Sequence, residues 1–454
     1  MVQGQNGLPE NWKEMTPEQK RQWRLKNFAS GDGFQFNSQQ ARAKYIKTAQ
    51  RFVDAYNIQE PDRIPIVLPV GDLPYTLYGI NLHTAMYDIQ EGVEACQQFN
   101  QKYAAELEYF ATPSMLIPAK TLEVLDYKLY SWPGHGLSED APGYQFLEGE
   151  YMKAEEYSEL IVDPSDFWLR TYMPRVFGAF EPFTLLPALT SIFEMPIGKL
   201  EALADPKFKV TLRKLLEVSE DLEKRKAIIE DYASLGLASG YAVMPRAGLA
   251  KAPFDTLGDT LRGTTNMMKD LYRRPDKIIE AVDVIAKVTI NNILNASNFS
   301  KMVSVTFPLH KGADGWMSQK QFDTFYFPSL KKVMDAIINE GLIVTLFAEG
   351  SFNTRLESVA VFPKGSVCWH FDQTDMYRAK KILGEKYTLQ GNIPSSLIVT
   401  GSPSDVKAYC RKLIESCGPG GGYILGSGAT AERPKLENLQ AMVSAAKEYG
   451  TYKK

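Results

Sequence analysis

The sequence predicts an α/β protein built as a single (β/α)8 TIM barrel. The chain has 454 residues, and from Pro61 onward short apolar runs that end in Gly, Pro or Asp alternate with longer stretches of helical pattern. Short, mostly apolar runs are typical of parallel strands that are covered on both faces. Alternation of strands and helices, repeated about eight times, favours a barrel over an open sheet. The expected strands are Ile64–Val70, Ser114–Ile117, Tyr241–Met244, Met302–Thr306, Leu342–Ala348, Val367–Phe371, Tyr387–Gln390 and Tyr423–Leu425.

The expected order of parts is an N-terminal helical extension over residues 1–60, followed by the barrel over residues 61–454. Thr16 to Gln19 form a capping box with Pro17 at the first helical position, which marks the start of a charged helix. An elaborated insertion is expected at about residues 130–226, where the alternation of strands and helices is interrupted. This stretch is rich in aromatic residues and Pro and then continues as a charged helix. The helices expected between the later strands include Ser329–Glu340, Thr374–Leu383 and Ser404–Ser416.

Composition excludes several classes of protein. Lys and Arg number 51 against 54 Asp and Glu, a net charge of −3, so no global basic field is present for nucleic acid. Four Cys without a CxxC pair fit a reducing compartment rather than a disulfide framework. The polar N-terminus shows no signal peptide, and no apolar run approaches the roughly 20 residues of a membrane helix. We therefore expect a cytoplasmic protein that binds neither nucleic acid nor membrane.

Polar side chains that follow the expected strands are the candidate site residues, because chemistry in such barrels lies at the strand carboxyl ends. Glu349 follows the apolar run 342–348, so burial there is expected to raise its pKa and suit it to acid–base catalysis. The alternative for Glu349 is an ion pair with Arg355 on the rim. Alternation along 367–371 places His370 and Asp372 on one face, and we predict both as catalytic with Glu349. The alternative for His370 is a purely structural histidine.

Other strand ends supply the predicted ligand-binding side chains. Amides follow the seventh strand in the turn 390–394, and a Gly-Ser-Gly turn that follows the eighth strand allows a bulky ligand to approach the backbone. The predicted binding residues are Asp72, Tyr75, His310, Gln373, Gln390, Asn392 and Ser427. No metal site is predicted, since Cys368 and His370 lack a further soft ligand, although a hard site of His310, Glu349 and Asp372 stays open. Dinucleotide, P-loop, HExxH and GxSxG motifs do not occur.

The stretch from about Pro308 to Lys447 resembles the uroporphyrinogen decarboxylase superfamily, which includes corrinoid-dependent methyltransferases. The resemblance rests on an ordered series of segments: Gly315–Ser318, Phe327–Lys331, Leu346–Gly350, Phe371–Thr374, Leu389–Pro394 and Pro434–Leu439. Arg63–Pro65 and the segments Ser114–Pro118 and Trp132–Gly134 add a weaker match in the N-terminal half. The family fold is a (β/α)8 barrel with a pocket at the strand carboxyl ends.

Departures from the family pattern are informative about the reaction. Val70–Tyr75 contains no Arg where the decarboxylases carry an Arg-rich loop, Ser114 stands for their catalytic Asp, and Ser427 stands for their late His. Decarboxylation of an octacarboxylate is therefore not expected. The His-x-Cys-Gly of the zinc-dependent thiol methyltransferases is replaced by 347–350, and their second Cys by Ser427. No zinc is expected.

The resemblance then implies methyl transfer between a small O- or N-methyl compound and a corrinoid (cobalamin). Because no DxHxxG segment occurs, the corrinoid is expected on a separate small corrinoid-binding protein. Proton delivery would fall to Glu349 or His370, with Asp372, Gln390 and Asn392 positioning the ligand. A lyase or decarboxylase acting on a cyclic acid, and a non-catalytic barrel that binds a tetrapyrrole, remain alternatives. Whether the chain is a homodimer is left open.

Overall fold

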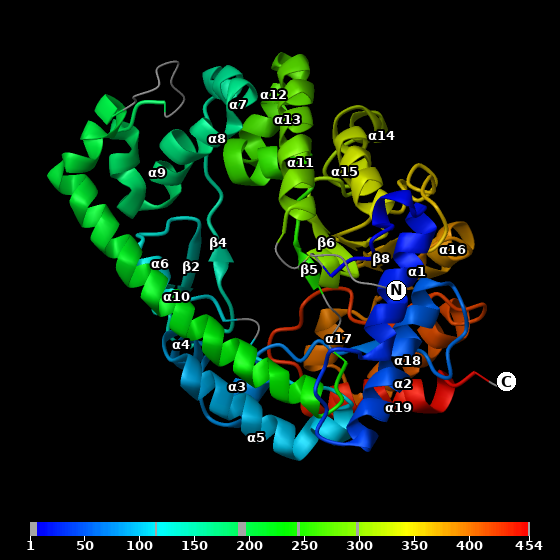
Figure 1. Ribbon diagram of the computed structural model, residues 1–454. Coiled ribbons are helices and arrows are strands. Elements are labelled where there is room, and N and C mark those ends of the chain that lie inside the picture. The colour runs from blue at the N-terminus through cyan, green and yellow to red at the C-terminus, as the bar shows by residue number, and fades with distance from the viewer. Residues whose placement is uncertain (1–6, 114–115, 189–196, 243–245, 297–298, 453–454) are drawn as a thin grey trace.

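Seven parallel strands form one curled sheet at the centre of the molecule (Figure 1). This computed structural model describes residues 7–113, 116–188, 197–242, 246–296 and 299–452. The strands are ordered β1-β10-β9-β8-β7-β6-β5, so neighbours in the chain are neighbours in the sheet as in a TIM barrel. Their bounds are β1 Ile66–Val67, β5 Arg246–Leu249, β6 Ser304–Leu309, β7 Ile343–Ala348, β8 Val367–Phe371, β9 Thr388–Gln390 and β10 Tyr423–Gly426. The predicted class, an α/β fold of TIM-barrel type, is confirmed.

Two expected strands differ from the sheet that is found. The prediction of a strand over Ser114–Ile117 is wrong for Leu116 and Ile117, which join no ladder, while residues 114 and 115 lie outside the described residues. The strand expected over Tyr241–Met244 is found instead at β5, and Met244 also lies outside the described part. The described sheet is therefore a half-barrel whose edge strands are β1 and β5.

Strand alternation divides the sheet residues between two layers. Val344, Leu346 and Ala348 of β7 are buried in the main core together with residues of the outer helices. Phe347 pairs in register with His370 of β8, and His370 pairs with Gln390 of β9, so these three lie on the other, inward face. This register places His370 on the inward face as predicted, while Asp372 lies just beyond the end of β8, after the last residue of that strand that is paired in register.

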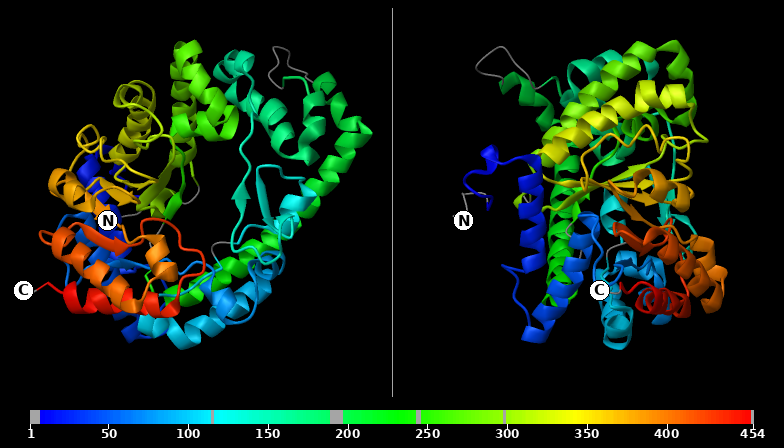
Figure 2. Two further views of the ribbon diagram at one scale, coloured as in Figure 1. Left: turned by 180° about the vertical axis from the view of Figure 1, so that it is seen from behind. Right: turned by 90° about the vertical axis from the view of Figure 1, so that its right-hand side faces the viewer.

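Helices cover the outer face of the sheet and lengthen the connections (Figures 1 and 2). Those of the second half are α11 Pro253–Asp255, η6 Thr256–Arg262, α12 Thr264–Arg273, α13 Pro275–Leu294, α14 Gln319–Gln321, η8 Phe322–Tyr326, α15 Phe327–Asn339, α16 Met376–Leu383, α17 Ser395–Thr400, α18 Pro403–Cys417 and α19 Leu436–Tyr449. The sequence-predicted helices correspond to α15, α16 and α18. Between β1 and the small sheet lie α3 Leu73–Leu77, α4 Leu82–Tyr87, α5 Ile89–Leu107 and α6 Ala119–Val124.

The region predicted as an insertion forms a separate arm beside the sheet. A small sheet of β2 Tyr130–Pro133, β3 Gly136–Leu137 and β4 Gln145–Phe146 is followed by α7 Tyr157–Val162, α8 Pro164–Phe167 and α9 Met173–Val176. Helix α10, Pro206–Ala238, runs 33 residues along the edge of the molecule (Figure 1). In the described part of the chain, no helix combines the length and the apolar character needed to cross a membrane.

Two N-terminal helices seal the amino ends of the strands. Helix α1, Pro17–Ser30, begins at the predicted capping box, with Thr16 and Gln19 bonded to each other's backbone. Helix α2, Gln39–Tyr56, packs with α1 against the start of the sheet, in a separate apolar cluster. This cluster joins Leu25, Phe28 and Phe52 of the helices to Ile343 and Cys368 of the strands. The two helices therefore cover the amino ends of β7 and β8.

Arg24 fastens α1 to the sheet through backbone carbonyls. Its side chain is 1% exposed. Its Nε donates to the Glu340 carbonyl at 3.0 Å, and its Nη1 donates to the carbonyls of Phe299 and Met302 at 2.8 Å each. The ring of Trp12 lies 4.8 Å from the guanidinium carbon. Burial lowers the pKa of Arg24 to about 10.

Replacing Arg24 by Ala is expected to lower the free energy of unfolding by about 3 kcal/mol, because three buried carbonyls lose their donor and a cavity is left. Urea denaturation followed by circular dichroism measures the change. Lys26→Ala is the matched control, since Lys26 is an exposed cation on the same helix. An equal loss in both variants would contradict the proposed anchoring by Arg24.

Candidate active site

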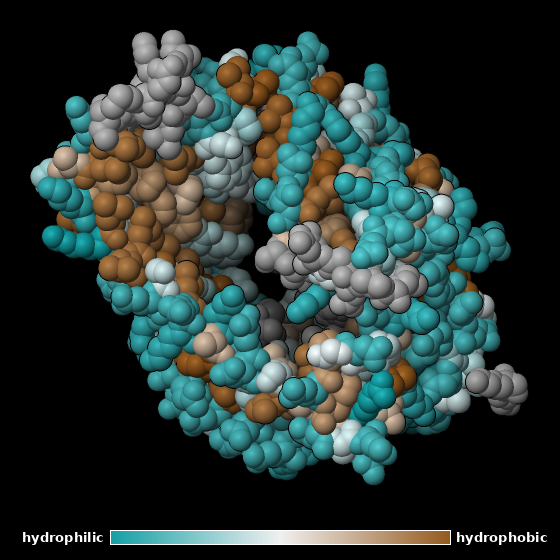
Figure 3. Space-filling model, viewed as in Figure 1, coloured by the Kyte–Doolittle hydropathy of each residue, from teal (hydrophilic) through white to brown (hydrophobic). Residues whose placement is uncertain are grey.

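The carboxyl ends of β6, β7 and β8 lie side by side and bring three predicted residues to one edge of the sheet. Leu309 pairs with Ala348, and Ala348 pairs with Phe371, so His310, Glu349 and Asp372 each follow the last pair of adjacent strands. Figure 3 shows that the molecule is hollowed between this sheet and the arm that carries α10. The side chains of His310 and Glu349 at this edge are 32% and 44% exposed and thus accessible.

Two aspartates that sequence reasoning missed support this edge from the side. Asp255 and Asp259 lie one helical turn apart in α11 and the following π-helical turn η6, a type of irregularity that is frequent at functional sites. Asp255 is fully buried and accepts the backbone N–H groups of His310 at 3.0 Å and Lys311 at 2.8 Å, and the hydroxyl of Tyr326 at 2.7 Å. Burial and the nearby charge of Asp259 raise the pKa of Asp255. Asp255 thus fixes the loop that carries His310.

His310 is held between two carboxylates. Its Nδ1 lies 2.6 Å from Oδ2 of Asp259, and its Nε2 lies 3.5 Å from Oε1 of Glu349. Burial on its own lowers the pKa of His310, but the hydrogen bonds to Asp259 and Glu349 and the nearby negative charges outweigh it and raise the pKa to about 10. His310 is therefore a protonated imidazolium at neutral pH, with both N–H groups directed at carboxylates.

Asp259 also forms ion pairs with two lysines. Lys251 Nζ lies 2.9 Å from Oδ2 and Lys311 Nζ lies 3.0 Å from Oδ1 of Asp259. Burial raises the pKa of Asp259, but the hydrogen bond from His310 and the charges of the lysines outweigh it and hold the pKa well below its ordinary value. Glu349, in contrast, is not the buried carboxylate that its position predicted, since its side chain is 44% exposed. Glu349 pairs with His310 and not with Arg355, which interacts with the carbonyl of residue 317 and with Gln319.

An aromatic strap faces this charged cluster. We use "strap" for residues 127–151, which include β2 to β4. Burial raises the pKa of Tyr130, and Tyr144 and the charges of Asp259 and Glu349 raise it further, so Tyr130 lies near both carboxylates. The rings of Tyr144 and Phe146 contact Tyr130 edge to face at 5.7 and 5.4 Å. Tyr130 thus joins an aromatic group on the strap to the surroundings of Asp259 and Glu349.

The strap is fastened at two points to the barrel. Arg433, in the loop after β10, donates to the carbonyl of Asp140 at 2.8 Å. Glu148 accepts the backbone N–H of Thr264 at 2.7 Å and lies 3.7 Å from Nζ of Lys311. The strap therefore spans the space between the last strand and the loop that carries His310.

Three more predicted residues order the loops beyond β8 and β9. His370 Nε2–H donates to the Ser427 carbonyl at 2.8 Å, and the ring of His370 lies 4.8 Å from that of Phe347. Asp372 accepts the backbone N–H of Gly350 at 3.0 Å. Asn392 donates to the carbonyls of residues 372 and 374, both at 2.8 Å. These bonds connect neighbouring strand ends, and the predicted ligand-binding and catalytic roles of these residues remain predictions.

The other predicted residues are dispersed. Gln390 is buried on the inward face, and the side chain of Gln373 is exposed. Asp72 accepts the backbone N–H of Arg433 at 2.7 Å and lines a cavity of about 350 Å³ under one end of the strap. Tyr75 is not brought to this edge: it is 1% exposed, and burial next to Cys96 raises its pKa. Ser114, the counterpart of the family's catalytic Asp, lies outside the described residues.

Within the described ranges, no three His, Cys, Asp or Glu side chains gather in a way that could hold a metal ion. The four cysteines are free and buried, and burial raises the pKa of each thiol to about 12. The charged side chains that the structure gathers at this edge are those of the His310 cluster.

Comparisons with known proteins agree with this architecture. A profile of the family described as uroporphyrinogen decarboxylase (URO-D) matches residues 181–449. Uroporphyrinogen decarboxylase from Sodalis glossinidius is 24% identical over 176 residues, which cover 38% of this chain and 48% of that protein. The enzyme of the same name from an Azoarcus species is 27% identical over 185 residues, covering 39% and 49%. The chain thus spans about half the length of these curated relatives.

Among solved structures, a methyltransferase from Methanosarcina mazei superposes with a TM-score of 0.53 at 15% identity. The superposition covers 88% of this chain and 98% of that one, so the fold extends well beyond the stretch matched in sequence. The family profile covers more than half of the chain and includes β5 to β10 and the His310 cluster. The chain therefore belongs to the uroporphyrinogen decarboxylase family.

Proposed function

We propose that the chain is a methyltransferase that moves a methyl group between a small O- or N-methyl compound and a corrinoid carried by a separate small protein. Three observations support this: family membership, the structural likeness to a methyltransferase, and the cluster around His310. The observation that carries the proposal is the position of His310 at the carboxyl edge of the sheet, with Nδ1 2.6 Å from Asp259 and Nε2 3.5 Å from Glu349.

Removal of a methyl group from oxygen or nitrogen leaves an anion or a strongly basic lone pair that has to be protonated. His310 can deliver the proton from Nε2, because its contact with Glu349 at 3.5 Å is long enough to be exchanged for a substrate heteroatom. Asp259 keeps Nδ1 protonated, Lys251 and Lys311 keep Asp259 ionised, and Asp255 positions the loop. Glu349 would then receive a proton from solvent and return it to His310.

A corrinoid, when bound, supplies the nucleophile that accepts the methyl group. The aromatic group of Tyr130, Tyr144 and Phe146 on the strap, with Tyr130 near Asp259 and Glu349, suits a large, partly apolar ring. The same aromatic group suits the flat ring of a methoxy-aromatic substrate. This chain binds and orients the methylated compound and holds the proton at His310.

The proposal is tested with the purified chain, cob(I)alamin and a panel of methoxy-aromatic compounds and methylamines. We expect the demethylated product, measured by mass spectrometry, to form only when cob(I)alamin is present. His310→Gln is expected to lower the rate by a factor of about 100 or more, since general acid catalysis contributes about that much. His135→Gln is the matched control, because His135 lies on the strap beside Trp132 and outside the cluster. Absence of product across the panel would contradict the proposal.

A second candidate is decarboxylation of a small cyclic acid. It is favoured by the cationic Lys251, Lys311 and His310, which could hold a carboxylate, and by the decarboxylase activity named for the matched relatives. Protonation of the carbon left after loss of carbon dioxide would again fall to His310. Release of carbon dioxide from such an acid without cobalamin would support this candidate over methyl transfer.

A further inference from the structure

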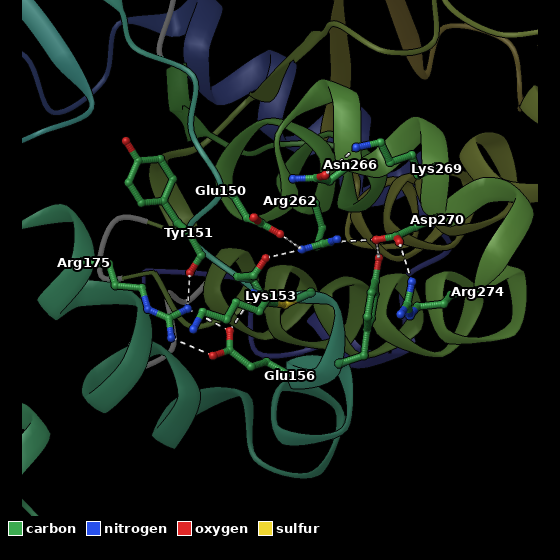
Figure 4. Close-up of polar contacts among 12 residues, drawn as sticks. Glu150, Tyr151, Lys153, Glu156, Arg175, Arg262, Asn266, Lys269, Asp270 and Arg274 are labelled. Carbon is green, nitrogen blue, oxygen red and sulfur yellow. Dashed lines mark hydrogen bonds and ion pairs between the residues drawn. The ribbon is translucent and has the colours of Figure 1, made fainter.

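We propose that a second cavity, outside the cluster around His310, binds small anions that carry two or more negative charges, such as phosphate compounds or polycarboxylates. The cavity has a volume of about 430 Å³ and lies between α12 and the segment at residues 150–155, where the strap ends (Figure 4). Its lining includes none of the residues that contact His310. The proposal therefore concerns a site separate from the proposed methyl transfer.

The charges that line the cavity favour an anion. Five cationic side chains line it against three carboxylates. Asp270 is fully engaged, since it accepts hydrogen bonds from Arg262 at 2.7 Å, Tyr157 at 3.0 Å and Arg274 at 3.3 Å. Glu150 is held by Arg262 at 2.6 Å. The excess positive charge therefore lies on the remaining cations.

Three of those cations form no ion pair in the described part of the chain, although Lys153 lies near Glu156, which Arg175 holds at 2.6 Å. Lys153 and Arg273 form no ion pair there, and Lys269 has only a 3.5 Å contact to the amide oxygen of Asn266. Asn266, Lys269 and Arg273 are spaced by three and four residues, so they share one face of α12 and line the same cavity. Figure 4 shows Asn266 and Lys269 next to each other above Arg262.

Arg262 gives the cavity a fixed, buried cation. Its side chain is 3% exposed and is held by Asp270 through Nε and by Glu150 through Nη1. A guanidinium fixed in this way does not have to be ordered when a ligand binds, which lowers the entropy cost of binding. Asn266 lies in the first turn of α12, where the helix dipole also favours negative charge. The cavity thus combines one fixed guanidinium, that of Arg262, with the side chains of Lys153, Lys269 and Arg273. Several donors around one cavity suit the several oxygens of a phosphate or a polycarboxylate.

Isothermal titration of the full chain with pyrophosphate and, separately, with citrate at low salt tests the site. We expect binding by the unmodified chain, and a Kd about tenfold or more weaker in Lys269→Ala/Arg273→Ala, because two charge-assisted contacts are lost. Glu155→Gln is expected to tighten binding several-fold, since it removes a negative charge from the lining. Binding of pyrophosphate alone would assign the site to phosphate compounds, and equal binding of citrate would assign it to polyanions in general.

The control is Lys277→Ala/Arg378→Ala, which removes the same number and types of cation from exposed positions outside the cavity. Its Kd is expected to match that of the unmodified chain. No binding of either anion at millimolar concentration, or equal weakening in the control, would overturn the proposal. Melting temperatures of all variants confirm that each is folded, and the outcome does not depend on the methyl-transfer assay.

Discussion

Replacing Asp259 by Asn is expected to move the alkaline limb of the pH–rate profile down by two to three pH units. Asp259 raises the pKa of His310 to about 10, so the active imidazolium form persists through neutral pH. Without the carboxylate, the pKa should fall toward the ordinary histidine value of about 6.5. At pH 8 the rate is then expected to fall by a factor of about 2 to 10 through loss of the proton alone, and by more if the ring reorients.

The rate of Asp259→Asn should recover in part at pH 6, which a merely misfolded variant would not show. Asp283→Asn is the control, since Asp283 pairs with Lys287 and Lys332 on the surface and is expected to leave the profile unchanged. An unshifted alkaline limb in Asp259→Asn would contradict the role given to His310. Because the folded pKa of His310 lies above its unfolded value, its contribution to stability is complete below about pH 6.5 and is lost as pH rises through about 10.

Replacing Arg262 by Ala is expected to lower the free energy of unfolding by about 3–5 kcal/mol, the range found when one partner of a buried ion pair is removed. The side chains of Arg262 and Asp270 are only 3% and 2% exposed, so the remaining carboxylate would be left in the core without its main partner. Denaturation in urea measures the change. This loss is also the reason that Arg262 is not a suitable position for testing anion binding.

Arg274→Ala provides the matched comparison, because Arg274 contacts the same Asp270 from a 39% exposed position at 3.3 Å. Its loss is expected to cost about 0.5 kcal/mol, as is usual for an exposed pair within a helix. Equal losses in the two variants would show that burial does not govern the energetics of this cluster. A double-mutant cycle of Arg262→Ala with Asp270→Ala should show a large coupling energy.

The sequence predicted strands best where an apolar run has a sharp end. The runs 342–348 and 367–371 became β7 and β8 with ends within one residue, because Glu349-Gly350 follows the first run and Asp372 follows the second. The expectation for Leu116 and Ile117 failed, since a short apolar pair is equally compatible with a buried loop. Helices were predicted closely where Pro or a capping residue marks the start, as Asp375 does for α16.

The sequence predicted only part of the candidate site. The prediction considered polar residues that follow expected strands, so it could not find residues that a helix contributes. It identified His310 and Glu349, which lie 3.5 Å apart. It missed Asp255 and Asp259, which belong to a helical turn after β5 and would ordinarily be taken for a solvated helix face. A usable signal was present: Phe254, Leu257 and Leu261 are apolar neighbours of these aspartates, and carboxylates among such residues are buried and need partners.

The seal formed by α1 and α2 has a consequence for the order of events under the proposed function. With the amino ends of the strands closed by Leu25, Phe28 and Phe52, the carboxyl edge is the end of the strands at which ligands reach the interior. A small methylated compound and a protein that carries a large ring then have to arrive from the same direction. Under the proposed function, the small compound would be seated first, and its demethylated product would leave only after the corrinoid protein departs. Binding of both at one edge of the sheet thus predicts an ordered sequence of arrival and exit.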